Sequence, residues 1–248
     1  MTATVVIVGG LGSLPGLWTP VTELLDPAVT VVHYRRPTVA IDLHREVAEL
    51  ARLIGRRSAR ETVVLVAHSM GAFGAEALAR CCPGSVDRLV LIDPSIAVSR
   101  RKPLGPLHSA RASMVDRVAG LLSRNHRGSR LFRVLQPLLL RRLSAGQVAE
   151  IAESLNDSDY LARSVTEWNS YSTLAADLIG LRRRHPRLCA PTMIVTAARH
   201  RGARWWVNGH RKLAIELAAD HRIIDRAGHL LMVERPEVVA ELITEQYR

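Results

Sequence analysis

Short runs of β-branched and other apolar residues recur along the first hundred positions and once more in the last quarter of the chain. They occupy residues 4–9, 29–33, 62–67, 88–92 and 191–196. Runs of this length, without regular polar alternation, are typical of strands buried on both faces of a parallel sheet. The pattern therefore predicts a parallel sheet at the centre of the fold.

Helical periodicity separates most of these runs. Apolar positions at helical spacing occupy residues 40–57, 70–81, 205–219 and 236–247. Pro236 suits the first turn of the last of these helices, where its missing N–H has no helical partner to lose. Strands that alternate with helices indicate an α/β fold with a mostly parallel, doubly wound sheet.

One long interval breaks this alternation. Residues 95–188 contain no convincing strand. Their helical patterns lie near 109–124, 129–143, 145–156 and 158–182. An interval this long exceeds a plain connection between a strand and the next helix. We therefore expect a core formed by residues 1–94 and 189–248, with residues 95–188 inserted as a helical cap.

A candidate nucleophile lies between a strand and a helix. Residues 62–74 read TVVLVAHSMGAFG, and Ser69 falls in the turn, with the small residues Ala67 and Gly71 two positions to either side. Such a turn holds a serine in a strained conformation, and small neighbours let strand and helix approach closely. The hydroxyl would then project at the carboxyl edge of the sheet, where ligands bind in open α/β folds. An ordinary helix-capping serine is the alternative.

At this point the chain resembles the α/β-hydrolase superfamily. The segment AHSMG resembles the GHSMG elbow of that family, with alanine in place of the first glycine. Residues 8–21 resemble its oxyanion loop, and residues 88–95 resemble the strand after the nucleophile helix. Residues 227–243 resemble its histidine loop and final helix. The resemblance implies an α/β-hydrolase fold that lacks the first two strands of the family and carries a cap at the place of the unmatched insert.

A serine hydroxyl needs a base within hydrogen-bond reach to act as a nucleophile. His229 is the candidate because Ala227 and Gly228 form a tight turn directly after a last strand, which is expected to contain Asp225 and is additional to the five runs above. This turn places the imidazole at the sheet edge that carries Ser69. The resemblance assigns the same histidine. A structural loop histidine is the alternative.

The acid that would complete a catalytic triad is less directly indicated by the sequence. The family usually places its acid after the penultimate strand, but residues 196–202 (TAARHRG) contain no carboxylate. A variation within the family moves the acid to the end of the strand after the nucleophile helix, where Asp93 stands. Asp93 is therefore the expected acid, which would orient the imidazole. Asp225, four residues before His229, is the alternative.

An oxyanion hole needs two preorganised N–H donors. The elbow geometry assigns one to Met70, which follows the nucleophile. The resemblance assigns the other to Leu11, after Gly9 and Gly10, and the glycines of this loop permit a close backbone approach.

The composition indicates the cellular compartment and the state of the cysteines. The chain has no apolar stretch of about 18 residues that would span a membrane, and its N-terminus is typical of a buried strand rather than a signal peptide. The three cysteines, Cys81, Cys82 and Cys189, show no metal-ligand spacing. We therefore expect a cytoplasmic protein with reduced thiols and without a metal or other cofactor.

Charge is concentrated in one segment. The net charge is +11, and +10 of it lies between Arg100 and Arg142, which contain eleven basic residues and one acid. The segment has neither a recognised module nor the interleaved aromatic residues of a nucleic-acid interface. Two interpretations remain: a solvated arginine-rich face, or attraction of an anionic substrate such as a coenzyme A ester or a carrier-bound acyl group.

These observations favour a serine hydrolase that cleaves an ester or thioester of a small or carrier-bound acyl substrate through an acyl-enzyme. A lyase, cyclase or C–C bond hydrolase with the same triad is the first alternative. A non-catalytic binding protein on this scaffold is the second, since fold alone does not determine function. The oligomeric state is left open.

Overall fold

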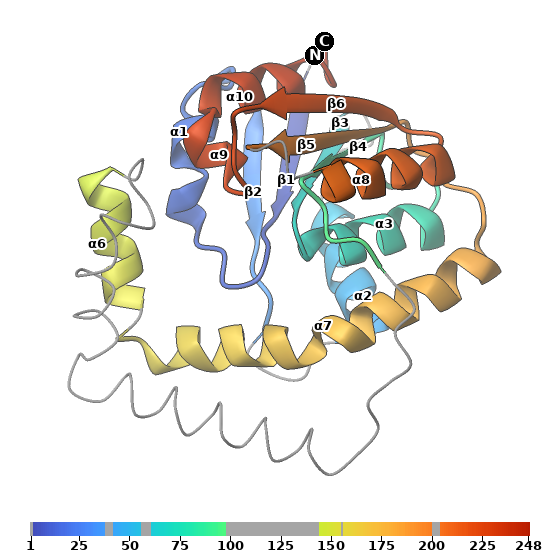
Figure 1. The fold of residues 1–248 in the computed structure, drawn as a ribbon, viewed down its shortest axis with the longest axis horizontal. Coiled ribbons are helices and arrows are strands. Elements are labelled where there is room, and N and C mark those ends of the chain that lie inside the picture. The colour runs from blue at the N-terminus through green and yellow to red at the C-terminus, as the bar shows by residue number, and fades with distance from the viewer. Residues whose placement is uncertain (1, 38–41, 56–60, 98–143, 155, 200–203) are drawn as a thin grey trace. The chain divides into compact units, whose positions relative to one another are not determined.

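The computed structural model describes residues 2–37, 42–55, 61–97, 144–154, 156–199 and 204–248. Their strands are β1 (Ala3–Val8), β2 (Thr30–Tyr34), β3 (Thr62–His68), β4 (Arg88–Ile92), β5 (Thr192–Ala198) and β6 (Asp220–Asp225). These strands form one sheet in the order β2-β1-β3-β4-β5-β6, and every neighbouring pair is parallel. The expected parallel α/β fold is confirmed (Figure 1).

Both faces of the sheet are covered by helices, and the central strands are buried accordingly. All six residues of β1 are buried, as are six of the seven in β3. Helices α2 (Leu43–Ile54), α3 (Gly71–Cys81) and α8 (Arg204–Leu217) form one group beside the sheet. The 3₁₀ turn η1 (Pro15–Leu17) leads into α1 (Thr19–Thr22), which packs against α9 (Leu231–Glu234) and α10 (Pro236–Thr244) (Figure 1). The carboxyl ends of the parallel strands therefore share one edge, which is where the site is built.

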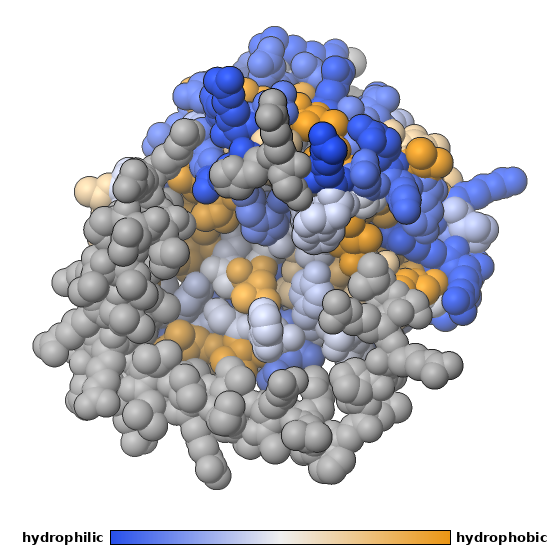
Figure 2. Space-filling view, in the orientation of Figure 1, coloured by the Kyte–Doolittle hydropathy of each residue, from blue (hydrophilic) through white to orange (hydrophobic). Residues whose placement is uncertain are grey.

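The edge strand β6 differs from the central strands. Its sequence is DHRIID, and four of its six positions are exposed. In Figure 2 the surface over β6 and α8 is largely hydrophilic. Charged side chains on an edge strand disfavour pairing with another sheet, so this composition protects the open edge.

The described residues divide into two compact units. The first contains the described residues that lie within 1–35, 42–99 and 173–248, and the second contains those that lie within 36–41 and 100–172. Helix α6 (Ala145–Ser154) and the start of α7 (Ser158–Arg184) belong to the second unit, and both agree with the helices expected there. The last turns of α7 group with the core, although the sequence places residues 173–188 in the insert.

Three of the sequence predictions concern residues that the structure does not describe. The helices expected near 109–124 and 129–143, and with them the basic segment, lie outside the described residues. The cap at 95–188 therefore stays a prediction. None of the helices described has both the length and the apolar character needed to cross a bilayer.

A buried ion-pair network fastens α3, the end of α7 and α8 together. Glu76 Oε1 accepts hydrogen bonds from Arg80 Nε at 2.8 Å and from Arg182 Nε at 2.8 Å. Glu76 Oε2 accepts a third from Arg182 Nη2 at 2.7 Å. Arg182 also pairs with the exposed Glu216 of α8. The Glu76 and Arg80 side chains are almost completely buried, so each charge depends on the other for compensation.

Replacing Glu76 with glutamine should destabilise the protein by about 3 to 5 kcal/mol, because two arginines would keep their charge in a buried site without the carboxylate. Urea or thermal unfolding followed by circular dichroism measures this loss. Glu216→Gln is the matched control. Its side chain is 52% exposed, and we expect a change of about 0.5 kcal/mol or less. Equal losses in the two variants would contradict the assigned role of the network.

Candidate active site

Ser69 follows β3 in a strained turn. Its φ of 52° lies in the left-handed region, which few non-glycine residues adopt. Its N–H donates to the Ile92 carbonyl at 3.1 Å, and its own carbonyl accepts from Ser95 N at 3.0 Å. These two bonds tie the turn to the end of β4. A side chain at Gly71 would collide with the Val8 and Gly9 carbonyl oxygens, which explains the small residue there.

His229 meets Ser69 at the carboxyl edge of the sheet. Its Nε2 lies 3.0 Å from Ser69 Oγ, and its Nδ1 lies 2.6 Å from Asp93 Oδ2. A carboxylate only accepts, so Nδ1 carries the ring proton and Nε2 is left to accept from the serine hydroxyl. The imidazole is about half exposed, at 49%. The structure thus brings the three expected residues into one hydrogen-bonded chain.

Asp93 is a buried carboxylate with three donors. Oδ2 faces His229, while Oδ1 accepts from Ala197 N at 3.0 Å and from Trp206 Nε1 at 2.8 Å. Burial alone would raise the pKa of Asp93, but the hydrogen bonds from these three groups outweigh it and hold the pKa below its usual range. Asp93 therefore remains a carboxylate at neutral pH. Asp225, the alternative acid, is an exposed residue at the end of β6.

His68 supports the backbone of the histidine loop. It is buried, and its Nε2–H donates to the His229 carbonyl at 2.9 Å. The two imidazole rings lie 4.5 Å apart. Burial, and then the charge of His229, lower the pKa of His68 to about 3. His68 is therefore a neutral scaffold residue beside the candidate nucleophile.

This lowered pKa predicts a loss of stability in acid. An unfolded chain protonates His68 below about pH 6.5, whereas the native protein does not until about pH 3. The contribution of His68 is thus fully present above pH 6.5 and falls by about 1.4 kcal/mol per pH unit as the pH is lowered through that window. In His68→Gln, the free energy of unfolding should depend less steeply on pH between 6.5 and 4. The exposed His44 gives the control variant, His44→Gln, and an equal slope in all three proteins would refute the argument.

The loop after β1 runs directly against the elbow. A Cβ atom at Gly10 would lie 2.9 Å from Ser69 Cβ and 3.0 Å from His68 Nδ1. Leu11 follows in the same loop, and Met70 follows Ser69 at the start of α3. The backbone that carries both expected oxyanion donors is therefore beside the serine. Their role as donors stays a prediction.

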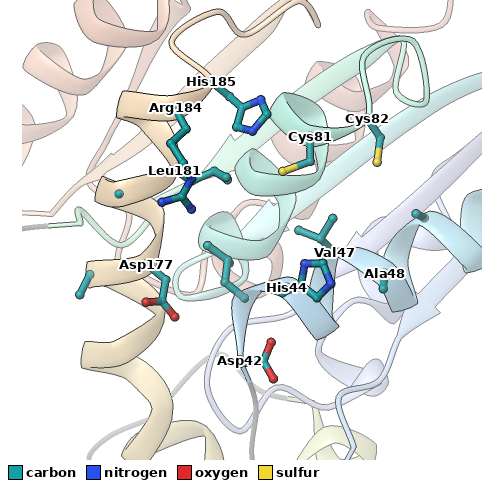
Figure 3. A pocket seen from close by; sticks show the side chains of 14 residues that line it. Asp42, His44, Val47, Ala48, Cys81, Cys82, Asp177, Leu181, Arg184 and His185 are labelled. Carbon is teal, nitrogen blue, oxygen red and sulfur yellow. The ribbon is translucent and has the colours of Figure 1, made fainter.

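A separate cavity of about 610 Å³ lies between α2, α3 and the end of α7 (Figure 3). It contains none of the three residues above. Burial raises the pKa of its Cys81, so the thiol is protonated at neutral pH and is a poor nucleophile. All three cysteines are free, and the part of the chain that is described holds no group of three or more potential metal ligands. This cavity is therefore separate from the cluster of Ser69, His229 and Asp93.

Comparison with known proteins now decides the family. A profile of the Alpha/beta hydrolase family matches residues 5–242. The chain belongs to this family. A search among curated proteins returned no significant match.

Solved structures share the fold of this α/β hydrolase at low identity. The Cif epoxide hydrolase from Acinetobacter nosocomialis superposes with a TM-score of 0.76 at 15% identity, covering 100% of this chain and 83% of that one. The thioesterase domain from the curacin biosynthetic pathway gives 0.69 at 16%, covering 98% and 91%. The N-formylmaleamic acid deformylase from Pseudomonas putida S16 gives 0.68 at 20%, covering 97% and 92%. The family supports a hydrolase-type enzyme, and the neighbours add the fold alone.

Sequence reasoning did not find every residue at the site of this α/β hydrolase. It left out Trp206 and the backbone N–H of Ala197, which both donate to Asp93. A backbone donor leaves no trace in residue type. The segment RWWVNGH at 204–210 offered a weak signal, because Trp206 and His210 are spaced to share one face of a helix.

Proposed function

We propose that this α/β hydrolase is a serine hydrolase that cleaves a carboxylic ester or thioester through an acyl-enzyme intermediate. Ser69 is the nucleophile, His229 the general base, and Asp93 the acid that orients the imidazole. The observation that carries the proposal is the hydrogen-bonded chain from Ser69 Oγ through His229 to Asp93, with distances of 3.0 and 2.6 Å. No cofactor is required for this reaction.

The proposed reaction has two halves. His229 Nε2 takes the hydroxyl proton as Ser69 Oγ attacks the acyl carbon, and the N–H groups of Leu11 and Met70 stabilise the oxyanion. The imidazolium then gives this proton to the departing alcohol or thiol, leaving an ester on Ser69. Water, deprotonated by the same imidazole, attacks that ester. The imidazolium then returns the proton to Ser69 Oγ as the bond between this oxygen and the acyl carbon breaks, which releases the acid and restores the serine hydroxyl. The buried charge of Asp93 stabilises the imidazolium in both halves.

Two other functions share this scaffold. A lyase, cyclase or C–C bond hydrolase would use the same triad on a different substrate, so only turnover separates it from an esterase. A binding protein would need no activated serine. The tautomer that Asp93 imposes on His229 favours catalysis over simple binding, because it leaves Nε2 to accept the serine proton.

The first experiment is reaction with a fluorophosphonate probe, which labels activated serines. Mass spectrometry of the digest should find the phosphonyl group on Ser69. A panel of nitrophenyl esters, acyl-coenzyme A thioesters and lactones then identifies the substrate class. Absence of labelling in a folded protein would favour the binding protein, and labelling without turnover of any ester would favour the lyase, cyclase or C–C hydrolase.

The basic segment between Arg100 and Arg142 suggests an anionic substrate. If the substrate carries coenzyme A or an acidic carrier, kcat/KM should fall as salt is added, because screening shortens the Debye length from about 10 Å at 0.1 M to about 3 Å at 1 M. Neutral esters give the control, since they should show little loss. Equal salt dependence for both substrate types would leave this segment as a solvated surface.

A further inference from the structure

The carboxylate of Asp93 is held by an element outside the sheet. Trp206 lies in the first turn of α8, and its indole Nε1–H donates to Asp93 Oδ1 at 2.8 Å. The same oxygen accepts from Ala197 N on β5 at 3.0 Å. The other oxygen, Oδ2, faces His229 Nδ1 at 2.6 Å. Two donors therefore fix one oxygen while the other serves the imidazole.

This division matters because the terminal torsion of an aspartate is broad and poorly determined by its own rotamer preferences. A single contact with His229 would leave the carboxylate plane free to rotate. With both Trp206 and Ala197 bonded to Oδ1, rotation of the plane would break hydrogen bonds in a buried site. Oδ2 is thereby kept in line with the ring nitrogen.

Trp206 is itself held in place by contacts on α8. Its ring contacts that of His210, one turn further along α8, with centroids 4.5 Å apart. His210 is completely buried, and its Nε2–H donates to the carbonyl of Pro94 at 2.7 Å. The Thr196 hydroxyl donates to the other His210 nitrogen at 2.9 Å and accepts from His221 Nε2 at 2.7 Å. This chain anchors α8 to the residue that follows the triad acid.

We infer that Trp206 is a positioning residue, whose indole N–H holds the carboxylate of Asp93 in the orientation that meets His229. The inference rests on the proposed serine-hydrolase function. Trp206 acts on the reaction through Asp93. The family's usual acid position, on the loop after β5, has no carboxylate here, and the end of β5 instead supplies a donor to an acid on β4. Trp206 completes that arrangement from α8.

The test compares two neighbouring tryptophans. Trp206→Phe keeps an aromatic ring beside His210 and removes the N–H. Trp205→Phe is the matched control, because the Trp205 side chain is 71% exposed and phenylalanine keeps an aromatic ring for the edge-on contact that Trp205 makes with Trp206. Rates are divided by the number of active sites titrated with the fluorophosphonate probe. We expect kcat per site to fall by about 10- to 100-fold in Trp206→Phe with KM within about twofold, by analogy with the loss of hydrogen bonds that orient metal-ligating side chains. Trp205→Phe should match the wild type.

A proton NMR signal gives a readout that does not depend on turnover. The His229 Nδ1 proton, in a short charge-assisted bond, should resonate far downfield in the wild type and in Trp205→Phe. In Trp206→Phe it should move upfield or broaden. If the phenylalanine variant does not fold, Trp206→Leu replaces it, since leucine also lacks the donor.

The possible results distinguish a failure of the positioning role of Trp206 from a failure of the proposed serine-hydrolase function. Unchanged kcat per titrated site together with an unchanged Nδ1 signal in Trp206→Phe would overturn the positioning role. A fall only in the number of titratable sites would also overturn it, because that result indicates a merely structural role. A wild type that never labels on Ser69 would overturn the proposed function, and the NMR signal would still show whether Trp206 holds Asp93.

Discussion

Replacing Ser69 with alanine is expected to lower kcat for ester hydrolysis by roughly a millionfold, to the level left by substrate binding and the oxyanion donors alone. Alanine has no atom that can form the acyl-enzyme, so the covalent route is closed. The fold should remain intact, because the backbone bonds of this turn to Ile92 and Ser95 do not involve the side chain.

Steady-state kinetics on the best ester of the panel measures this loss, and mass spectrometry should find no phosphonyl adduct at position 69. Ser85→Ala is the control, since Ser85 lies beyond the other end of α3 and bonds to the Cys82 carbonyl. It should keep wild-type kcat. Retention of substantial activity in Ser69→Ala, with a purified and folded protein, would remove the mechanism proposed for this chain.

Asp93→Asn should lower kcat by about ten-thousandfold while the protein still folds. The amide oxygen can occupy the Oδ1 position and keep the bonds from Ala197 and Trp206. The amide NH₂ would then face His229 Nδ1 as a donor. Nδ1 would have to accept, so the ring proton would move to Nε2, which could no longer take the proton of Ser69. The developing imidazolium would also lose its counter-charge.

The control for this prediction is Asp225→Asn, which changes the alternative acid in the same way. Asp225 is exposed at the end of β6, and its variant should keep kcat within about twofold. Circular dichroism and fluorophosphonate labelling rates complement the kinetics. A large loss in Asp225→Asn combined with a small one in Asp93→Asn would reverse the assignment of the acid.

The fold could be predicted from residues that report their surroundings directly. Strands β1 and β3 are continuous apolar runs because both of their faces are covered, as the complete burial of Val5 and Val64 shows. The edge strand β6 has no such run. Four of the six positions in its sequence DHRIID are exposed, so polar and charged residues are accepted there. Its place could be expected only from the histidine loop that follows it.

Some residues of the candidate site could likewise be predicted from local sequence, and others could not. Ser69 and His229 stand next to small residues that indicate a tight turn, so local sequence was sufficient to select them. Asp93 required two further facts: the missing carboxylate at 196–202 and a resemblance to the family. The spacing of Trp206 and His210 gave only a weak signal, and the hydrogen bond from Trp206 to Asp93 could not be foreseen, because it spans 113 residues and depends on how α8 is placed against the end of β4.

The backbone of Asp93 restricts which residues can replace it. Its φ of 42° lies in the left-handed region, where glycine, asparagine and aspartate are the residues best tolerated. A saturation library at this position, sorted for folding alone, should therefore recover glycine, asparagine and aspartate together. The same library sorted for turnover should recover aspartate only, since glutamate has the charge but is one methylene longer and lacks the backbone preference. Position 93 is thus a site where mutational tolerance depends on what is selected.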